Sequence, residues 1–262
     1  MFLKKNKTFI IAEIGNNHEG SLKIAKELIR KAKLCEVDAV KLQFIDPSKF
    51  FHSSLKKNIK KYKKFFLGKD KLMKLKIFAD KLGIKLFTTF FDLKNLNTIG
   101  KNFNLYKIAS SDNNYKELIS ETIKKKKKTF ISLGLLEKQE ILRLINFLKK
   151  INKDAHKHVS LMYCVSSYPA DKKEIDLNKI IYLKQKFPKF KIGYSDHFIG
   201  NEACLAAVSL GAEVIEKHFT LSKKFSKFRD HQLSADPKEM KSLVKGIRII
   251  DTMLFNNDKN FK

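Results

Sequence analysis

Residues 191–220 read KIGYSDHFIGNEACLAAVSLGAEVIEKHFT, and this stretch contains two short apolar runs separated by a longer one with helical spacing. The first run, residues 191–194, and the second, residues 213–216, have the length and apolar content of buried strands. A strand, a helix and a second strand in this order form the βαβ unit of a parallel sheet. The stretch therefore predicts an α/β fold.

The same alternation continues outward over the rest of the chain. Six more strand-like runs occur, at residues 8–14, 39–44, 85–89, 105–108, 129–133 and 159–164. Amphipathic helical stretches separate them, for example at residues 21–34 and 137–150, and Pro237 behind Asp236 marks the start of a last helix over residues 237–254. Eight strands favour a single (β/α)8 TIM barrel, for which 262 residues is a fitting length.

A doubly wound open sheet is the structural alternative, since it also alternates strands and helices. The chain has no G-x-G-x-x-G or Walker A sequence, the nucleotide-binding fingerprints that would favour that fold. No linker divides the chain, so residues 1–262 are predicted to form one domain. The basic stretch at residues 46–69 is expected to lie over one end of the barrel, together with its aromatic residues Phe50, Phe51, Phe65 and Phe66.

Composition indicates a cytoplasmic protein. Hydrophobic residues make up 43% of the chain, yet no apolar run approaches the ~18 residues that span a bilayer. The start, residues 1–5, reaches the first strand too early for a signal-peptide core, so we expect no membrane insertion. The three cysteines, Cys35, Cys164 and Cys204, lie in apolar contexts without a Cys-x-x-Cys pair, which predicts neither a disulfide framework nor a cysteine-based zinc site.

The net charge of +28 raises the question of nucleic-acid binding. Lysines are scattered over almost every predicted helix, and the densest run, residues 124–128, lies between a helix and a strand as a solvated connection. We therefore expect no specific nucleic-acid partner. A general positive field would still attract anionic substrates.

Reactive side chains occupy the carboxyl ends of the predicted strands, where a barrel assembles its active site. A purely structural barrel would seldom place such groups at every mouth position. In chain order they are Glu13, Lys41, Gln43, Thr89, Lys107, Ser110, Asp112, Ser132, Ser166, Tyr168, Ser195, His197, Glu216 and His218.

Two of these side chains, Lys41 and Lys107, lie within or beside apolar strand segments. A buried ammonium is costly unless an anion meets it, so each lysine is expected to contact either an anionic ligand, which we favour, or an internal carboxylate of Glu13 or Glu216. The serines at successive strand ends are typical of turns and caps when taken singly. Repeated beside two lysines, they indicate a cradle for phosphate and carboxylate oxygens.

His197 and His218 end consecutive predicted strands. A single histidine in such a place is commonly a structural residue. Two on neighbouring strands can share a divalent metal through neutral imidazole nitrogens, with open positions for water and substrate. The residues alone leave both interpretations open.

Six ordered motifs resemble those of the N-acetylneuraminate (sialic acid) synthase family. They cover the chain from about residue 9 to residue 249 and lie at residues 11–20, 40–43, 106–110, 164–169, 193–197 and 214–220. The resemblance implies a transferase that condenses phosphoenolpyruvate with N-acetylmannosamine or a related 2-acetamido sugar. The products would be phosphate and a nine-carbon 2-keto acid of sialic, legionaminic or pseudaminic type, used for surface polysaccharide.

The resemblance also implies roles for particular residues. Mn²⁺ or Mg²⁺ is expected at His197 and His218, which count with Glu13 as catalytic. The residues expected around phosphoenolpyruvate are Lys41, Thr89, Lys107, Ser110, Ser132, Ser166 and Ser195. Those expected to face the sugar or the reacting centre are Glu13, Gln43, Asp112, Tyr168 and Asp230.

The chain departs from the family pattern at Thr88-Thr89-Phe90-Phe91, at Ser110-Ser111-Asp112 and at Ser166. Typical members also continue into a small antifreeze-like domain that reaches a partner subunit's sugar site, whereas this sequence stops at Lys262 after the last predicted barrel helix. We therefore expect a barrel domain alone, with a sugar site that is open, completed by a separate antifreeze-like polypeptide, or built for another aldehyde. The alternative is a phosphoenolpyruvate-binding barrel that is inactive or needs a partner chain. A homodimer would have to rest on barrel surfaces.

Overall fold

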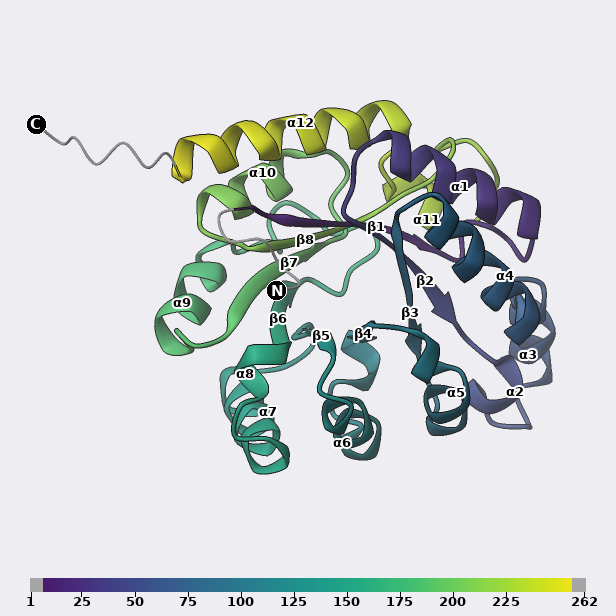
Figure 1. Cartoon of the computed structure of the whole chain (residues 1–262), viewed down its shortest axis with the longest axis horizontal. Helices are drawn as coiled ribbons and strands as arrows, with labels where there is room; N and C mark the ends of the chain where they lie inside the picture. Colours follow the sequence, from purple (N-terminus) through teal and green to yellow (C-terminus); the bar gives the residue numbers. More distant parts are fainter. Residues whose placement is uncertain (1–6, 256–262) are drawn as a thin grey trace, which may run out of the picture.

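Eight parallel strands close into a barrel with the helices on its outside (Figure 1). The computed structural model describes residues 7–255. Each strand pairs with its neighbours in chain order, and β8 pairs with β1. The strands are β1 (Phe9–Gly15), β2 (Ala39–Phe44), β3 (Lys85–Phe90), β4 (Leu105–Ile108), β5 (Lys128–Ser132), β6 (Val159–Cys164), β7 (Lys191–Asp196) and β8 (Val214–His218).

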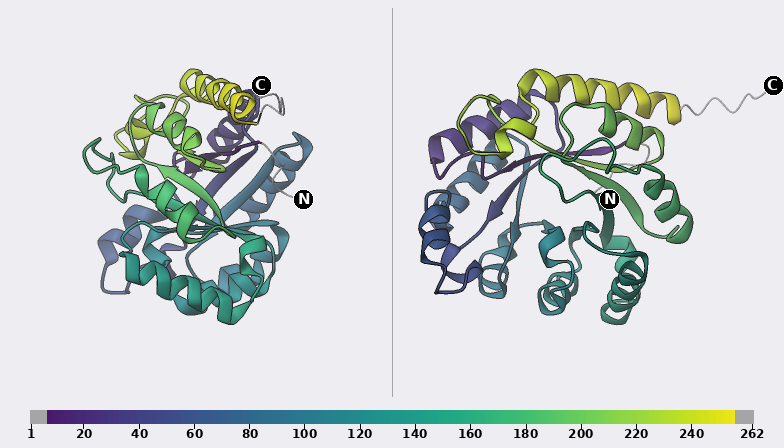
Figure 2. Two further views of the ribbon diagram at one scale, coloured as in Figure 1. Left: turned by 90° about the vertical axis from the view of Figure 1, so that its left-hand side faces the viewer. Right: turned by 180° about the vertical axis from the view of Figure 1, so that it is seen from behind.

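Both views in Figure 2 show the helices around the strands, which confirms the predicted TIM barrel. The helices are α1 (Leu22–Leu34), α2 (Pro47–Phe50), α3 (Lys56–Lys63), α4 (Gly68–Lys81), α5 (Leu93–Thr98), α6 (Lys116–Lys124), α7 (Lys138–Ile151), α8 (Ala155–His158), α9 (Asn178–Lys186), α10 (Glu202–Ser209), α11 (Asp230–Leu233) and α12 (Pro237–Leu254), with 3₁₀ turns η1 (Gly100–Asn102) and η2 (Ser110–Asp112). All eight predicted strands are present.

The last two strands run further than their apolar runs indicate. Strand β7 extends to Asp196 and β8 to His218, because Ser195 pairs with Glu216 and Asp196 with Lys217 in the parallel ladder. Pairing with the neighbouring strand thus keeps these polar residues in strand conformation, although their own strand propensity is low. As a result, the polar ends of β7 and β8 are fixed by backbone hydrogen bonds on both sides.

The register around the barrel brings functional side chains to one height. Glu13 on β1 is the partner of Lys41 on β2 and of His218 on β8. Since side chains alternate along a strand, residues two apart share one face, and Glu216 and His218 point to the same side of β8. The carboxyl ends of β1, β2 and β8 therefore present their polar groups to one space.

Helix α12 closes the outside of the barrel beside α10 and α1 (Figure 1). Its first turn is fixed by a capping box, in which Asp236 accepts from the Glu239 backbone and the Glu239 side chain accepts from the Asp236 backbone. Pro237 at the first position needs no hydrogen-bond donor there. These local signals explain why the sequence predicts this helix with the observed bounds.

The basic insertion after β2 contains α2 and α3, which lie on the right in Figure 1. Aromatic contacts tie it to two strand ends. The Phe50 ring lies 5.4 Å from Phe91, which follows β3, and the Phe65 ring lies 4.8 Å from Phe228, in the loop after β8. The predicted position over one barrel end is therefore confirmed, and that end is the carboxyl end of the strands.

Three further expectations concern the chain as a whole. No helix in the described part is long and apolar enough to cross a membrane. Cys35, Cys164 and Cys204 are buried and free. The expectation for residues 1–5 lies outside the described residues.

We predict that Gly193→Ala destabilises the barrel by about 1–3 kcal/mol, the usual cost of overpacking. A Cβ there would lie 2.5 Å from Met162 Sδ and 2.7 Å from the Val214 carbonyl oxygen, and the latter belongs to the backbone. Gly246→Ala is the control, because its Cβ would meet only the flexible end of Leu205. Urea denaturation of both variants measures the difference; equal stability would show that the lumen tolerates the extra methyl group.

Candidate active site

Two lysines and two glutamates form a buried charge cluster at the carboxyl end of the barrel. Lys41 Nζ lies 2.9 Å from Glu13 Oε1 and 3.7 Å from Glu216 Oε1, and Lys107 Nζ lies 2.7 Å from Glu216 Oε1. The four side chains are at most 5% exposed. The internal ion pairs that the sequence left open are therefore present, and the two carboxylates, when both are ionised, balance the two ammonium groups.

Neighbouring polar groups complete the cluster. Ser195 Oγ donates to Glu216 Oε1 over 2.9 Å, and Gln43 Nε2 donates to Glu13 Oε1 over 3.1 Å. Glu13 Oε2 and Glu216 Oε2 are buried without a hydrogen-bond partner among the described residues. The cluster thus retains acceptor capacity for a bound molecule or water.

Burial affects the two carboxyl groups differently. Burial raises the pKa of Glu13 to about 7, and the nearby Lys41 only partly opposes this. Burial acts in the same sense on Glu216, but Lys107 and Lys41 together outweigh it and lower its pKa to about 2. Glu216 is therefore a permanent anion, while Glu13 changes protonation near neutral pH, as proton-transfer groups in active sites do.

His197 and His218 converge beside the cluster, with ring centroids 5.4 Å apart. His197 Nδ1 lies 2.6 Å from the Val165 carbonyl oxygen; a carbonyl only accepts, so Nδ1 carries the proton and Nε2 keeps its lone pair. His218 Nδ1 is buried without a hydrogen-bond partner among the described residues. Burial lowers the pKa of His197 to about 4 and that of His218 as well, which leaves both rings neutral.

This donor set fits a divalent cation. Neutral imidazole nitrogens are ligands for Mn²⁺-type ions, and two protein ligands leave positions for water and substrate. Within residues 7–255 no group of three or more His, Cys, Asp or Glu side chains is arranged to hold a metal by itself. A metal here would need further ligands from water or substrate.

The other side of the mouth is lined by an aromatic and charged group. The Tyr168 ring packs 4.0 Å from the His197 ring, and the Arg229 guanidinium lies 5.1 Å from the Tyr168 ring. Arg229 Nε is 3.4 Å from Asp230 Oδ1, and burial raises the pKa of that carboxyl group. Tyr168 is 39% exposed, so this side remains open to solvent.

The hydroxyl groups of two predicted site serines occupy the space beside Gly134, which follows β5 and has no side chain. A Cβ at this position would lie 2.4 Å from Ser166 Oγ and 2.6 Å from Ser110 Oγ. Ser166 Oγ is buried without a hydrogen-bond partner among the described residues. Gly134 therefore makes room for two hydroxyl groups at the mouth.

The structure places most predicted site residues in this region, although their roles remain predictions. Lys41 Nζ is 3.5 Å from Thr89 Oγ1, and Ser132 is buried at the end of β5. Asp112 is the exception, since its side chain accepts only from its neighbour Ser111 among the described residues. Its shorter side chain stays within its own turn.

A family model described as the NeuB family matches residues 28–259. The chain is also 38% identical to an uncharacterised protein of Methanocaldococcus jannaschii, over 98% of this chain and 74% of that protein. The chain belongs to the NeuB family. This confirms the predicted resemblance and the predicted enzyme class, a transferase that forms a carbon–carbon bond.

Two proteins named as synthases are also similar to this chain. N,N'-diacetyllegionaminic acid synthase of Campylobacter jejuni is 35% identical, over 93% of this chain and 76% of that protein. The crystal structure of N-acetylneuraminic acid synthetase from Leptospira borgpetersenii, in complex with citrate, superposes with a TM-score of 0.91 at 33% identity, over 99% of this chain and 90% of that one.

The sequence predicts Glu216 only as a possible ion-pair partner of the lysines and assigns it no role toward substrate or metal. It contacts both lysines and Ser195, so it connects three strand ends. Alternation could have identified it, because Glu216 lies two residues before His218 and must share its inward face.

A second omission is the buried ion pair behind the histidines. Lys217 Nζ lies 2.6 Å from Asp196 Oδ2, and both side chains are at most 1% exposed. Asp196 Oδ1 accepts from Tyr194 OH over 2.8 Å and from Phe198 N over 3.0 Å, and Lys217 donates to the Phe198 carbonyl oxygen. The pair therefore fixes the chain on both sides of His197.

We predict that Lys217→Met destabilises the protein by about 3–5 kcal/mol, because it leaves the Asp196 carboxylate buried without its cation. Lys124→Met is the control: its ammonium is paired with Glu121 at the surface, where such pairs contribute at most about 1 kcal/mol. Thermal and urea denaturation give both values. A loss below 1 kcal/mol for Lys217→Met would contradict the assigned role of the pair.

Proposed function

We propose that this chain condenses phosphoenolpyruvate with the open-chain aldehyde of N-acetylmannosamine or a related 2-acetamido sugar, forming a nine-carbon 2-keto acid of sialic, legionaminic or pseudaminic type. The observation that carries the proposal is the buried cluster of Lys41, Lys107, Glu13 and Glu216 at the carboxyl end of a NeuB family barrel. The names of the similar proteins from Campylobacter jejuni and Leptospira borgpetersenii support this substrate class.

In this proposal the two lysines hold the phosphoryl and carboxylate groups of phosphoenolpyruvate, and hydroxyl groups supply further donors. The hydroxyl groups are those of Thr89, Ser110, Ser132, Ser166 and Ser195. Ion pairs with Glu13 and Glu216 keep the ammonium groups charged and positioned before the substrate enters. Positioning of two substrates is where much of the barrier reduction should come from.

Carbon–carbon and carbon–oxygen bonds then change in a fixed order. C3 of phosphoenolpyruvate attacks the aldehyde carbon, whose oxygen takes up a proton to become a hydroxyl group, and C2 becomes cationic. Water adds to C2 and loses a proton; the C2–O bond to phosphate then breaks as the C2 hydroxyl gives up its proton and becomes the ketone. Glu13 stands beside this developing positive charge as a carboxylate, which stabilises it. With its pKa near 7, Glu13 can take up the proton that the attacking water releases.

The acceptor sugar is assigned to the open side of the mouth, where Gln43, Tyr168 and Asp230 present polar groups, with Asp112 as a more distant candidate. His197 and His218 would hold Mn²⁺ or Mg²⁺, and such a cation, when bound, polarises a carbonyl oxygen. The neutral state of both rings supports this assignment.

A partner-dependent barrel remains the second candidate. Arg229 is 68% exposed and Tyr168 39% exposed, so the acceptor side of a single chain is open to solvent. A second copy of the barrel or a separate antifreeze-like chain would cover it. We place the protein in the cytoplasm, where phosphoenolpyruvate is made, with a product destined for surface polysaccharide.

We predict that purified protein releases phosphate from phosphoenolpyruvate only when Mn²⁺ and a suitable 2-acetamido sugar are present. A panel of such sugars, with and without an added antifreeze-like domain, identifies the acceptor.

Lys107→Ala should weaken phosphoenolpyruvate binding about 100-fold in calorimetry, because it removes a buried charged donor. Lys124→Ala is the matched control. Unchanged affinity of a folded Lys107→Ala protein would remove Lys107 from the site, and no turnover with any sugar would count against the activity.

The pH dependence gives an independent prediction. Burial raises the pKa of Glu13 to about 7, so as the pH falls below 7 the carboxyl group becomes protonated and kcat/KM should drop about tenfold per pH unit. Glu13→Gln should lower kcat by about 10²–10⁴ and abolish this acid limb. Glu121→Gln, at the surface, should change neither. An acid limb that persists in Glu13→Gln would assign the titration to another group.

A further inference from the structure

The opposite end of the barrel has an unusual lining. The parallel register brings the first inward residues of the odd-numbered strands into one layer, as in other eight-stranded barrels. That layer consists of Phe9, Lys85, Lys128 and Lys191. Three of the four positions are lysines, where branched apolar residues normally fill the lumen.

Two of the three lysines lie near aromatic rings, buried Lys128 and exposed Lys85. Lys128 Nζ lies 5.8 Å from the Phe130 ring, and Lys85 Nζ lies 6.0 Å from the Phe9 ring. Phe130 in turn stacks on Phe9 with centroids 6.0 Å apart. The ammonium groups of Lys128 and Lys85 therefore lie near a stacked pair of phenyl rings.

Lys128 is the cation without a counter-charge. It is 8% exposed, and no described carboxylate lies within ion-pair distance of its Nζ, whereas Lys191 is paired with Glu213 at 2.5 Å. Burial and the positive charge of Lys191 lower the pKa of Lys128 to about 7, and the negative charge of Glu213, which is not in ion-pair contact with Lys128, opposes this only in part. A buried ammonium in this state gains stability from any anion that reaches it.

A second group in the same place also lacks a partner. Ser160 is fully buried on the inward face of β6, next to Lys191 in the strand register, and its Oγ has no hydrogen-bond partner among the described residues. A buried hydroxyl without a partner costs free energy, so it indicates an unoccupied donor. Ser160 and Lys128 lie on adjacent strands and point into the same lumen.

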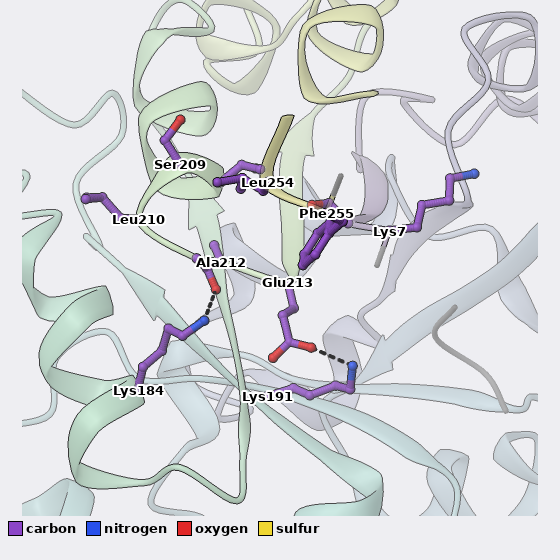
Figure 3. Close-up of a pocket in the computed structure, with 12 residues that line it drawn as sticks. Lys7, Lys184, Lys191, Ser209, Leu210, Ala212, Glu213, Leu254 and Phe255 are labelled. Carbon is purple, nitrogen blue, oxygen red and sulfur yellow. Dashed lines mark hydrogen bonds and ion pairs between the residues drawn. The ribbon is translucent and has the colours of Figure 1, made fainter. Parts of the chain in front are cut away.

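A cavity of about 400 Å³ lies beside this layer and shares Lys191 with it (Figure 3). Lys191 and Glu213 form part of its wall, and Figure 3 shows their side chains meeting there. Lys184 reaches into the same region and donates to the Gly211 carbonyl oxygen over 2.9 Å. The cavity wall is thus rich in cations and has Glu213 as its acidic residue.

We propose that the amino end of the barrel binds a small tetrahedral oxyanion such as inorganic phosphate, held by Lys128, Lys191 and Ser160. We call these three residues the basal site. The four oxygen atoms of phosphate can accept hydrogen bonds from two ammonium groups and a hydroxyl group, and charge-assisted hydrogen bonds of this kind are strong. Glu213 neutralises Lys191, so the charge of Lys128 is the one that the anion balances. The basal site does not depend on the proposed synthase activity.

Equilibrium dialysis with labelled inorganic phosphate tests the basal site. At an ionic strength of about 0.15 M the Debye length is about 8 Å, so surface lysines contribute little. Lys128→Met should weaken phosphate binding about ten- to a hundredfold, and Ser160→Ala about fivefold. Lys124→Met, an exposed lysine, should bind like the parent protein. Sulfate, which has the same shape, should displace the label.

The same measurements in a Lys107→Ala background separate the two ends of the barrel. The loss caused by Lys128→Met should persist there; if it disappears, the phosphate was bound at the active-site end and the proposal is overturned. Equal binding by the parent and Lys128→Met proteins, an equal loss in Lys124→Met, or displacement by chloride at the same ionic strength would overturn it too. If Lys128→Met does not fold, Ser160→Ala decides, and an unchanged affinity refutes the site.

Discussion

The balance of charge among Lys41, Lys107, Glu13 and Glu216 is the constraint on which the active end of this barrel depends. Either lysine alone would carry a large desolvation penalty at its burial of 3–5% exposure. Paired as they are, Lys41, Lys107 and Glu216 can remain ionised inside the protein, and Glu13 completes the charge balance when it is ionised. An anionic ligand that enters must therefore either displace a glutamate from a lysine or bind beside ion pairs whose charges already cancel.

That balance requires closure of the sheet. Glu13 comes from the first strand and Glu216 from the last, and they reach the same ammonium group only because β8 pairs with β1. If the same strand order were left open, the first and last strands would lie at opposite edges of the sheet. The closed register also explains why His218 stands level with Glu13. Charge, imidazole and hydroxyl groups thus share one space as a consequence of topology.

The fold and most of the site followed from the sequence because each depends on local signals. Apolar runs located the strands, and strand ends located Lys41, Lys107 and His197. Glu13 and Glu216 were candidate partners of the lysines, but which carboxylate meets which lysine could not be predicted, since a contact between Lys41 and Glu216 depends on the register of strands far apart in the chain. The role of Gly134 was equally hidden, because the space it provides is visible only when Ser110 and Ser166 are in place.

Buried lysines at the two ends of the lumen differ in their counter-charges. At the carboxyl end, each buried lysine has a glutamate from another strand, and the site is ready for chemistry. At the amino end, Lys128 has an aromatic ring and an unpaired hydroxyl nearby instead of a carboxylate. Alternation turns both sets of side chains inward: the carboxyl-end charges come from β1, β2, β4 and β8, and the amino-end lysines Lys128 and Lys191 come from β5 and β7. An internal carboxylate fixes a lysine permanently, whereas a missing one leaves its charge to an anion from solution.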